Sequence, residues 1–380
     1  MSQLKQAIKK RKTVYAALKM LQILKQSKWN KKYNMRKYPE VLQFPITNNC
    51  NSKCVMCNVT SNILHNEMSV EDFSKVINDP IFSNIKAVGI NGGEPFLSKN
   101  LIPFVRVLVQ KKSLQSLNII SNGFMTEVIL KNLKTIYGLC RENKKSFHVS
   151  FSLDGYQEIH DKVRGIPGAF QKTMRTINEV RNNMHLYCDS YDIGCTVVKE
   201  NVYHLVELET FARDVGLNIK FRLGIDNERL HNHSLHNSFS VFDDEKTHQA
   251  ALEFFYGLVL SSKNFYDQYK YWAIFSFLCG ERPRRLGCDW RDNGITMDGE
   301  GNLYYCAVAS PCIGNLKKDC GLDIFFRQEN INKKKSILVN KCDDCIHDYS
   351  GQLYFKDVLK FIKFKLCHRF WMKSYKRKMM

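Results

Sequence analysis

The sequence predicts an α/β fold, in which a partial (β/α)6 barrel is followed by a small Cys-rich C-terminal domain. From residue 41 to about residue 225, six short β-rich runs alternate with longer helical stretches. This alternation is typical of a parallel sheet, and right-handed crossovers leave few other arrangements. Several runs are mostly apolar, as expected for parallel strands that are covered on both faces. Residues 288–350 are instead rich in Gly, Asp and Cys, which indicates a separate small domain.

The predicted strands and helices follow one another along the chain. The strands are 41–47, 87–91, 116–121, 148–153, 192–198 and 219–225, and the helical stretches are about 69–79, 99–113, 126–143, 168–185 and 201–215. Ligands of such folds bind at the carboxyl ends of the strands. The predicted domains are a basic helical extension at 1–40, the barrel at 41–240, a helical connector at 241–287, the Cys-rich domain at 288–350 and a basic helix at 351–380.

Positive charge is concentrated at the two ends of the chain. Residues 1–40 contain 12 Lys and Arg with one acid, residues 353–380 contain nine with one acid, and the whole chain has a net charge of +20. These ends could attract an anionic membrane surface or an acidic partner, although solvated helix faces explain them equally well. No apolar run reaches the roughly 18 residues of a membrane span, and no secretory pattern is present. We therefore expect a cytoplasmic protein, with peripheral membrane contact as an alternative.

Three cysteines follow the first predicted strand directly, at Cys50, Cys54 and Cys57, with the spacing C-x3-C-x2-C. Without a secretory signal, the 14 cysteines indicate metal or redox chemistry rather than disulfides. Thiolates select iron–sulfur clusters, zinc or Cu(I). A structural zinc site normally has a fourth protein ligand, which this loop does not clearly supply. Three ligands leave one iron of a [4Fe–4S] cluster open to a cofactor, although zinc remains an alternative.

This loop resembles the signature of radical S-adenosylmethionine (SAM) enzymes. The resemblance implies that the three cysteines hold a catalytic [4Fe–4S] cluster whose open iron binds SAM. It also implies an electron donor such as flavodoxin or ferredoxin, whose electron cleaves SAM to a 5′-deoxyadenosyl radical that abstracts a substrate hydrogen.

Further motifs of this family occur at the ends of later predicted strands. Gly92-Gly93-Glu94-Pro95 resembles the GGEP segment, Ser121-Asn122-Gly123 a Ser-Asn-Gly turn, and residues 152–165 the S-x-D-G…H-D-x-x-R-G stretch. As isolated features they could be ordinary turns, caps and solvated charges. The resemblance implies SAM contacts at Gly92, Gly93, Glu94, Pro95, Asn122, Ser152 and Asp154, with Arg175 as the partner of the SAM carboxylate.

A second set of cysteines comprises Cys288, Cys306, Cys342 and Cys345, with turn signals between the first two that predict a hairpin. Four thiolates would close either a zinc ribbon or a fully ligated cluster. The set resembles the auxiliary-cluster domains called SPASM and twitch. Gly351 stands where SPASM has its next cysteine, so the resemblance implies a single auxiliary [4Fe–4S] cluster. Cys312 and Cys320 could replace a ligand, but we interpret them as ordinary cysteines.

An auxiliary cluster can accept an electron from a substrate radical, which makes the substrate's oxidation a natural outcome. We therefore predict a radical SAM oxidoreductase that oxidises or dehydrogenates a small, sugar-like or carrier-linked molecule. The alternative is an enzyme that modifies a peptide or protein; the roughly 40 residues before the first strand are few for a leader-binding domain. An alternative of another class is a zinc-binding, nucleic-acid-binding module. Candidate substrate contacts are Asn58, Arg222 and Asp226.

Overall fold

The computed structural model describes residues 38–62, 64–348, 351 and 353–379. The basic extension predicted for residues 1–40 lies almost wholly outside these ranges. Side chains of the last helix are described as far as residue 367.

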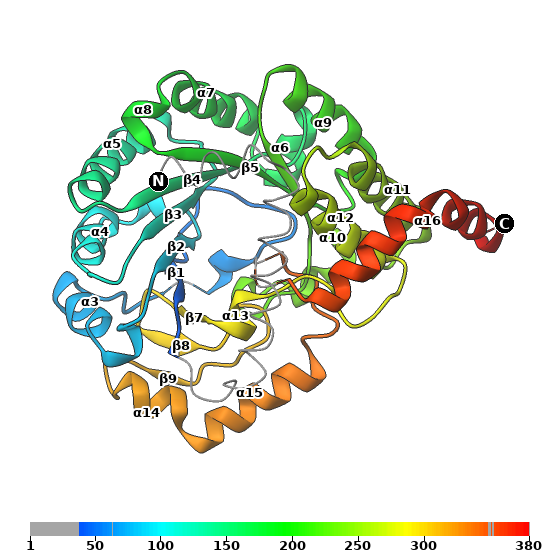
Figure 1. The fold of residues 1–380 in the computed structure, drawn as a ribbon. Coiled ribbons are helices and arrows are strands. Elements are labelled where there is room, and N and C mark those ends of the chain that lie inside the picture. Colours follow the sequence, from blue (N-terminus) through cyan, green and yellow to red (C-terminus); the bar gives the residue numbers. More distant parts are fainter. Residues whose placement is uncertain (1–37, 63, 349–350, 352, 380) are drawn as a thin grey trace, which may run out of the picture.

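One nine-stranded sheet organises the molecule, with the strand order β6-β5-β4-β3-β2-β1-β7-β8-β9. Strands β1 to β6 are parallel and adjacent in chain order, which confirms the predicted α/β partial barrel (Figure 1). The strands are β1 (Val41–Thr47), β2 (Ala87–Gly92), β3 (Ser116–Ser121), β4 (Ser146–Ser152), β5 (Ser190–Val197), β6 (Ile219–Leu223), β7 (Gly294–Met297), β8 (Asn302–Tyr304) and β9 (Gly314–Asn315).

The Cys-rich segment extends this sheet rather than forming a sheet of its own. Strand β7 pairs in parallel with β1, from Val41 opposite Gly294 to Gln43 opposite Thr296. Strands β7 and β8 form the hairpin that the turn signals predict, and β9 adds a short antiparallel edge. The composition change near residue 288 therefore does not mark a break in the sheet.

The helices are α3 (Val70–Ile77), α4 (Leu101–Val109), α5 (Thr126–Glu142), α6 (Glu158–Arg164), α7 (Ala169–Asn182), α8 (Met184–Tyr187), α9 (Leu205–Asp214), α10 (His236–Phe239), α11 (Glu245–Ser261), α12 (Phe265–Leu278), α13 (Asp289–Asp292), α14 (Gly321–Phe326), α15 (Gln328–Asn340) and α16 (Phe355–Met379). Of these, α3, α4, α5, α7 and α8 lie along the outer face of the curved sheet (Figure 1). Short 3-10 turns connect several of them, including η3 (Pro95–Leu97), η4 (Val202–His204) and η5 (Glu228–Leu230).

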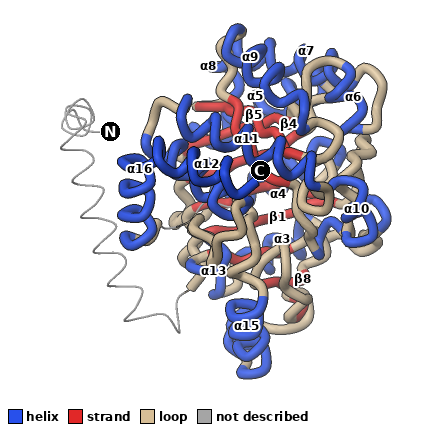
Figure 2. Tube along the Cα trace, turned by 90° about the vertical axis from the view of Figure 1, so that its right-hand side faces the viewer, coloured by secondary structure: helices blue, strands red, loops and turns tan. Residues whose placement is uncertain are grey.

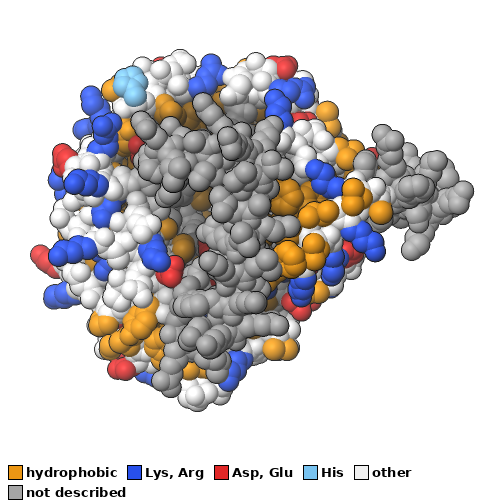
Figure 3. Space-filling model, in the orientation of Figure 1, with side chains coloured by type: hydrophobic (Ala, Val, Ile, Leu, Met, Phe, Trp, Pro, Cys, Tyr) orange, Lys and Arg blue, Asp and Glu red, His pale blue; other side chains and the backbone are white. Residues whose placement is uncertain are grey.

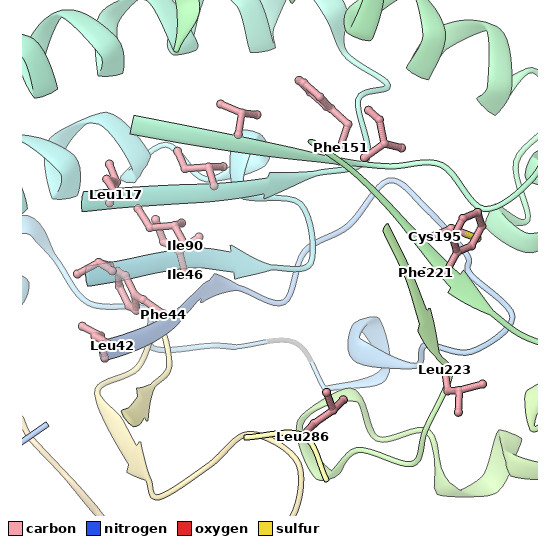
Figure 4. Packing of buried hydrophobic residues seen from close by; sticks show 14 of the residues in the cluster. Leu42, Phe44, Ile46, Ile90, Leu117, Phe151, Cys195, Phe221, Leu223 and Leu286 are labelled. Atoms are coloured by element: carbon pink, nitrogen blue, oxygen red, sulfur yellow. The ribbon is translucent and has the colours of Figure 1, made fainter. Parts of the chain in front are cut away.

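The main core lies between the strands and this outer helical layer. Alternate strand residues such as Leu42, Phe44 and Leu117 are fully buried against the helices (Figure 4). The rings of Phe73 in α3 and Phe104 in α4 stack with centroids 4.1 Å apart, and Phe44 lies 5.2 Å from Phe73. These ring contacts anchor the first helices to the first strand.

The inner face of the sheet differs from the sequence prediction. Apolar residues on both faces were expected, but the inward positions of β3 to β6 are largely polar or glycine. Because side chains alternate between the two faces of a strand, each strand combines an apolar outer row with this inner row. The inner row therefore lines a hollow instead of a second core.

Helices α11, α12 and α16 pack together beside the open side of the barrel (Figure 2). On α16, Val358 and Phe361 are fully buried, and Phe361 contacts the ring of Trp272 in α12 at a centroid distance of 5.3 Å. Leu359 and Leu366 of the same helix are exposed, and Figure 3 shows hydrophobic side chains near this helix. Within the described residues, none of the helices is both long enough and apolar enough to cross a bilayer.

Candidate active site

A large chamber occupies the inside of the barrel. Its volume is about 670 Å³, which lies within the 300–1,000 Å³ typical of a small-molecule pocket, and it is open to solvent on one side. Its wall includes inward strand residues and the loops at the carboxyl ends of the strands. Cys50, Cys54 and Cys57 all line it, so the structure brings the three predicted ligands to one space.

The cysteine loop is fixed by the end of α6. The backbone N–H of Lys53 donates to the carbonyl of Arg164 at 2.9 Å, and that of Val55 donates to Val163 at 2.9 Å. Gly165 ends α6 with φ 64°, and a Cβ there would lie 2.4 Å from the carbonyl oxygen of Lys53. Arg164 and Gly165, the last two residues of the H-D-x-x-R-G stretch, therefore pack against the cysteine loop and hold it in place.

A buried charge pair lies directly behind Cys54. The guanidinium of Arg164 donates to the sulfur of Cys54 at 3.4 Å and pairs with Asp154 at 2.6 Å. Asp154 is fully buried and also accepts from the backbone N–H of Thr196 at 2.7 Å. Burial acts to lower the pKa of Arg164, but the negative charges of Asp154 and Cys54 outweigh burial and raise this pKa above its usual value. The guanidinium of Arg164 therefore stays charged. It stabilises negative charge on Cys54.

The three thiols affect one another's ionisation. Burial raises the pKa of Cys50 to about 12, and negative charge on Cys54, Glu94 and Cys57 adds to this effect. Burial and Cys54 likewise raise the pKa of Cys57. Because iron or zinc binds thiolates, loading this loop must release protons.

An iron–sulfur cluster and a single metal ion require different arrangements of the three cysteine sulfurs. Within the described ranges, no three His, Cys, Asp or Glu side chains are gathered as ligands of one metal ion. The cysteines of a [4Fe–4S] cluster bind separate irons at the corners of a cube, and so they need not converge on one point.

The Gly-Gly pair after β2 packs against the start of the cysteine loop. A Cβ on Gly92 would lie 2.2 Å from the carbonyl oxygen of Thr47, and one on Gly93 would lie 2.1 Å from that of Asn49. The N–H groups of Gly93 and Glu94 donate to these same two carbonyls, at 2.7 and 2.8 Å. The sequence motif predicted glycine for approach to a ligand, whereas here the close neighbour is the chain that leads into Cys50.

Glu94 is fully buried and does not line the chamber. Its carboxylate accepts from the N–H of Asn122 at 2.8 Å and from the hydroxyl of Ser121 at 3.0 Å. Burial raises its pKa to about 7, although these donors oppose the rise. The amide of Asn122 in turn donates to Asn51 in the cysteine loop at 2.7 Å. Glu94 therefore positions Asn122, which does line the chamber.

The remaining predicted SAM contacts are not all in the chamber. Gly92, Gly93 and Ser152 line it, whereas Pro95 and Asp154 are buried behind it. Arg175 lies on α7, where its exposed side chain pairs with the exposed Glu127 of α5 at 2.5 Å. The structure therefore does not bring Arg175 into the chamber with the three cysteines. The arginines that do line the chamber are Arg164, Arg222 and Arg229.

A polar network covers the inner face of β4, β5 and β6. Asp192 accepts from Ser150 at 2.6 Å and pairs with Lys220 at 2.6 Å and with His148 at 3.3 Å. Burial disfavours its charge, but these partners outweigh burial and hold the pKa of Asp192 well below its usual range. No sequence signal other than an inward strand position could have identified this network. Of the other candidate substrate contacts, Arg222 lines the chamber, and neither Asn58 nor Asp226 is among its lining residues.

A second, small cavity of about 40 Å³ is lined by all four cysteines of the second set, Cys288, Cys306, Cys342 and Cys345. Burial raises the pKa of Cys306 and of Cys342 to about 11, with further increases from the neighbouring thiols of the set. Cys312 and Cys320 are exposed and are not among the lining residues.

Cationic side chains surround this second set. Arg284, Arg291, Lys334 and Lys341 line the cavity, and their charge would offset the negative charge of four thiolates around a metal centre. His347 lines both this cavity and the barrel chamber, and its ring lies 4.9 Å from that of Trp290. The two cysteine sets therefore face two cavities that share a wall.

Gly351 lies against the backbone of Cys288. A Cβ on Gly351 would be 2.2 Å from the nitrogen of Cys288. In this arrangement, a cysteine side chain at position 351 could not be accommodated without moving the second cysteine set.

Comparison with known proteins finds a family model that matches part of the barrel. Residues 44–208 match the Radical SAM superfamily. The Fe-coproporphyrin III synthase of Methanosarcina barkeri is 29% identical over 183 residues, covering 46% of this chain and 42% of that protein. The subtilosin biosynthesis protein AlbA of Bacillus subtilis is 24% identical over 288 residues, covering 74% and 58%. The chain spans about half the length of the curated relatives it matches.

Solved structures support the same fold over most of the chain. The structure of anSMEcpe with bound AdoMet and a peptide has a TM-score of 0.55 and 16% identity, covering 89% of this chain and 98% of that one. Streptococcus suis SuiB bound to its precursor peptide SuiA has a TM-score of 0.54 and 14% identity, covering 85% and 71%. Radical SAM domains use a [4Fe–4S] cluster and SAM, and AdoMet is bound in the anSMEcpe structure.

Proposed function

We propose that this protein is a radical SAM enzyme that modifies a side chain of a peptide or protein. The observation that carries the proposal is the three-cysteine loop at the carboxyl end of β1, which opens into the large chamber beside the permanent cation of Arg164. When bound there, a [4Fe–4S] cluster and SAM supply a 5′-deoxyadenosyl radical that removes a hydrogen atom from the substrate.

The residues around the loop fit this cofactor set. Cys50, Cys54 and Cys57 would hold the cluster, and Arg164 would stabilise the thiolate form of Cys54. Asn91 has a buried side-chain oxygen that finds no hydrogen-bond donor among the described residues, and it faces the chamber beside Gly92. Such an orphaned acceptor is costly unless a ligand donor reaches it. We therefore assign Asn91, Gly92, Gly93, Asn122 and Ser152 to the wall that contacts SAM.

Peptide modification has better support than the small-molecule oxidation that the short N-terminal segment suggested. The relatives matched only over the barrel include small-molecule enzymes, whereas AlbA is matched over 74% of this chain. The solved structures that resemble almost the whole chain include two with bound peptides. A chamber that is open to solvent can admit a flexible chain.

We further propose that Cys288, Cys306, Cys342 and Cys345 hold one auxiliary [4Fe–4S] cluster that accepts an electron from the substrate. His347 separates that site from the chamber, so an electron acceptor bound there would be next to the substrate. An external carrier such as flavodoxin or ferredoxin would supply the electron that starts each turnover.

Iron analysis and SAM cleavage test the two cluster assignments. Anaerobically reconstituted, reduced protein should form 5′-deoxyadenosine, and Cys54→Ala should abolish its formation. Cys342→Ala should lower the iron content and retain SAM cleavage, whereas the exposed Cys312→Ala should change neither. Zinc in place of iron and sulfide would refute the proposal.

The substrate class can be tested with an extract of the host cell. The peptide fraction should stimulate 5′-deoxyadenosine formation, and prior digestion of that fraction with protease should remove the stimulation. Stimulation that survives digestion would favour a small-molecule substrate instead.

A further inference from the structure

Two arginines in the chamber wall have hydrogen-bond donors that no described protein group accepts. These are Nε of Arg222 and both Nε and Nη1 of Arg229, and all three atoms are buried. A buried N–H donor without an acceptor is unfavourable, because it has lost water without gaining a partner. Such groups are usually satisfied by an anionic ligand.

The side chains of Arg222 and Arg229 come from β6 and from the turn that follows it, so both lie on the same side of the chamber. Arg222 is on an inward position of β6, and its Nη2 lies over Gly194 of β5, where a Cβ would be only 2.0 Å away. Arg229 belongs to the 3-10 turn after β6, and its N–H donates to the side chain of Asn227 at 3.0 Å. Gly194 thus leaves the space that the guanidinium of Arg222 occupies.

The acidic residues of the chamber do not neutralise this pair. The closest contact recorded for Arg222 is an ion pair with Asp348 at 3.9 Å, too long for a hydrogen bond. Asp348 is instead hydrogen-bonded to Lys270 at 3.1 Å. Asp192 is held by Lys220, as described above. Arg229 forms no ion pair with a carboxylate among the described residues, and its charged neighbour is the sulfur of Cys57, which leaves its Nε and Nη1 without acceptors.

Both arginines share the chamber wall with His347, which also lines the second cavity. The two arginines therefore lie near the wall between the chamber and the second cavity, where a substrate must be if the auxiliary site is to oxidise it.

We propose that Arg222 and Arg229 bind a carboxylate of the peptide substrate, either an acidic side chain or a free C-terminus near the residue to be modified. This inference rests on the proposed peptide-modifying function. A planar carboxylate accepts two parallel bonds from a guanidinium, so it would satisfy the donors that the protein leaves free. The pair would thereby select the substrate and fix its register in the chamber.

Calorimetric titration of the SAM-saturated holoenzyme tests the inference with three small probes. Acetyl-glutamate amide presents a side-chain carboxylate, acetyl-glutamine with a free C-terminus presents a terminal one, and acetyl-glutamine amide presents neither. At least one charged probe should bind about tenfold or more tightly than the neutral probe. The preferred charged probe identifies the source of the carboxylate.

Arg222→Gln and Arg229→Gln should each weaken binding of that probe by about tenfold or more. The exposed Arg175→Gln, which removes the same charge outside the barrel, should leave probe binding unchanged. Ligand-free Arg229→Gln should have a thermal midpoint no lower than wild type, because the change removes an unsatisfied buried charge. If it does not fold, Arg229→Lys replaces it and should also weaken binding, since an ammonium cannot bind in the two-bond geometry.

Equal binding of the charged and neutral probes would overturn the inference, as would normal probe affinity in both glutamine variants. Weaker SAM binding with normal probe binding would assign the pair to SAM and also overturn it. Wild-type protein that cleaves SAM but ignores the charged probes refutes the carboxylate subsite alone. Wild-type protein that cannot cleave SAM refutes the proposed function.

Discussion

Two arginine–carboxylate ion pairs in this protein have nearly the same N–O distance, but one pair is buried and the other is exposed. Comparing them tests how much burial contributes to the strength of the pair beside Cys54. Arg164 and Asp154 are 2.6 Å apart, with 10% and 0% of their side chains exposed. Arg175 and Glu127 are 2.5 Å apart, with 66% and 78% exposed. Substituting each arginine with methionine removes the charge and retains an extended side chain.

Arg164→Met should lower the free energy of unfolding by about 3–5 kcal/mol, because it leaves Asp154 as an uncompensated buried charge. Arg175→Met should cost about 0–1 kcal/mol, since water and salt screen an exposed pair. Urea unfolding of the metal-free proteins, with equal m-values, measures both differences. Arg164→Met should also reduce iron binding, because Cys54 loses its cationic donor.

A similar decrease in the free energy of unfolding for Arg164→Met and Arg175→Met would refute this prediction, because burial would then not determine the strength of the ion pair. Asp154→Asn provides a second test from the other partner. It keeps the shape of the side chain but leaves Arg164 without its counter-charge, so it should also destabilise the protein more than Arg175→Met does.

Two further predictions concern the support of the cysteine loop and the inner wall. Gly93→Ala places a Cβ 2.1 Å from the carbonyl oxygen of Asn49, so it should abolish SAM cleavage, whereas Gly257→Ala, an exposed helical position with open space around it, should not. Normal SAM cleavage by Gly93→Ala would contradict this prediction, because it would show that the cysteine loop can shift to accept the added methyl group. Asp192 has a lowered pKa in the folded state, so its stabilising contribution is present above the unfolded value of about 3.9 and lost as pH falls further. Asp192→Asn should therefore destabilise the metal-free protein more at pH 6 than at pH 3, as measured by urea unfolding; an equal loss at both pH values would contradict the assigned partners.

The sequence predicted the parallel strands well because their outer rows are short apolar runs bounded by turns. β1 and β3 have the predicted bounds. Helix α6 was missed, since it has only seven residues and follows Gln157, whose φ is 45°. The pairing of β7 with β1 joins residues about 250 positions apart, and no local pattern specifies such a contact.

The sequence predicted the site residues that belong to local motifs. It missed the residues whose place in the site depends on the tertiary structure. The three cysteines reach one chamber because they share a loop. Whether an arginine faces inward depends on its helix or strand face, so the sequence could not show that Arg175 lies outside the chamber and that Arg164 and Arg229 line it. Asp154 looked like a ligand contact, but its partner is a side chain ten residues away on a different element.

The parallel pairing of β1 with β7 has a consequence for electron exchange between the two cysteine sets. The first loop continues directly from β1, and β7 lies in the chain between Cys288 and Cys306. The first cysteine loop and the segment from Cys288 to Cys306 are therefore joined through two adjacent, hydrogen-bonded strands. Tunnelling rates fall steeply with separation, so a gap fixed by these strands would give every catalytic cycle the same transfer time.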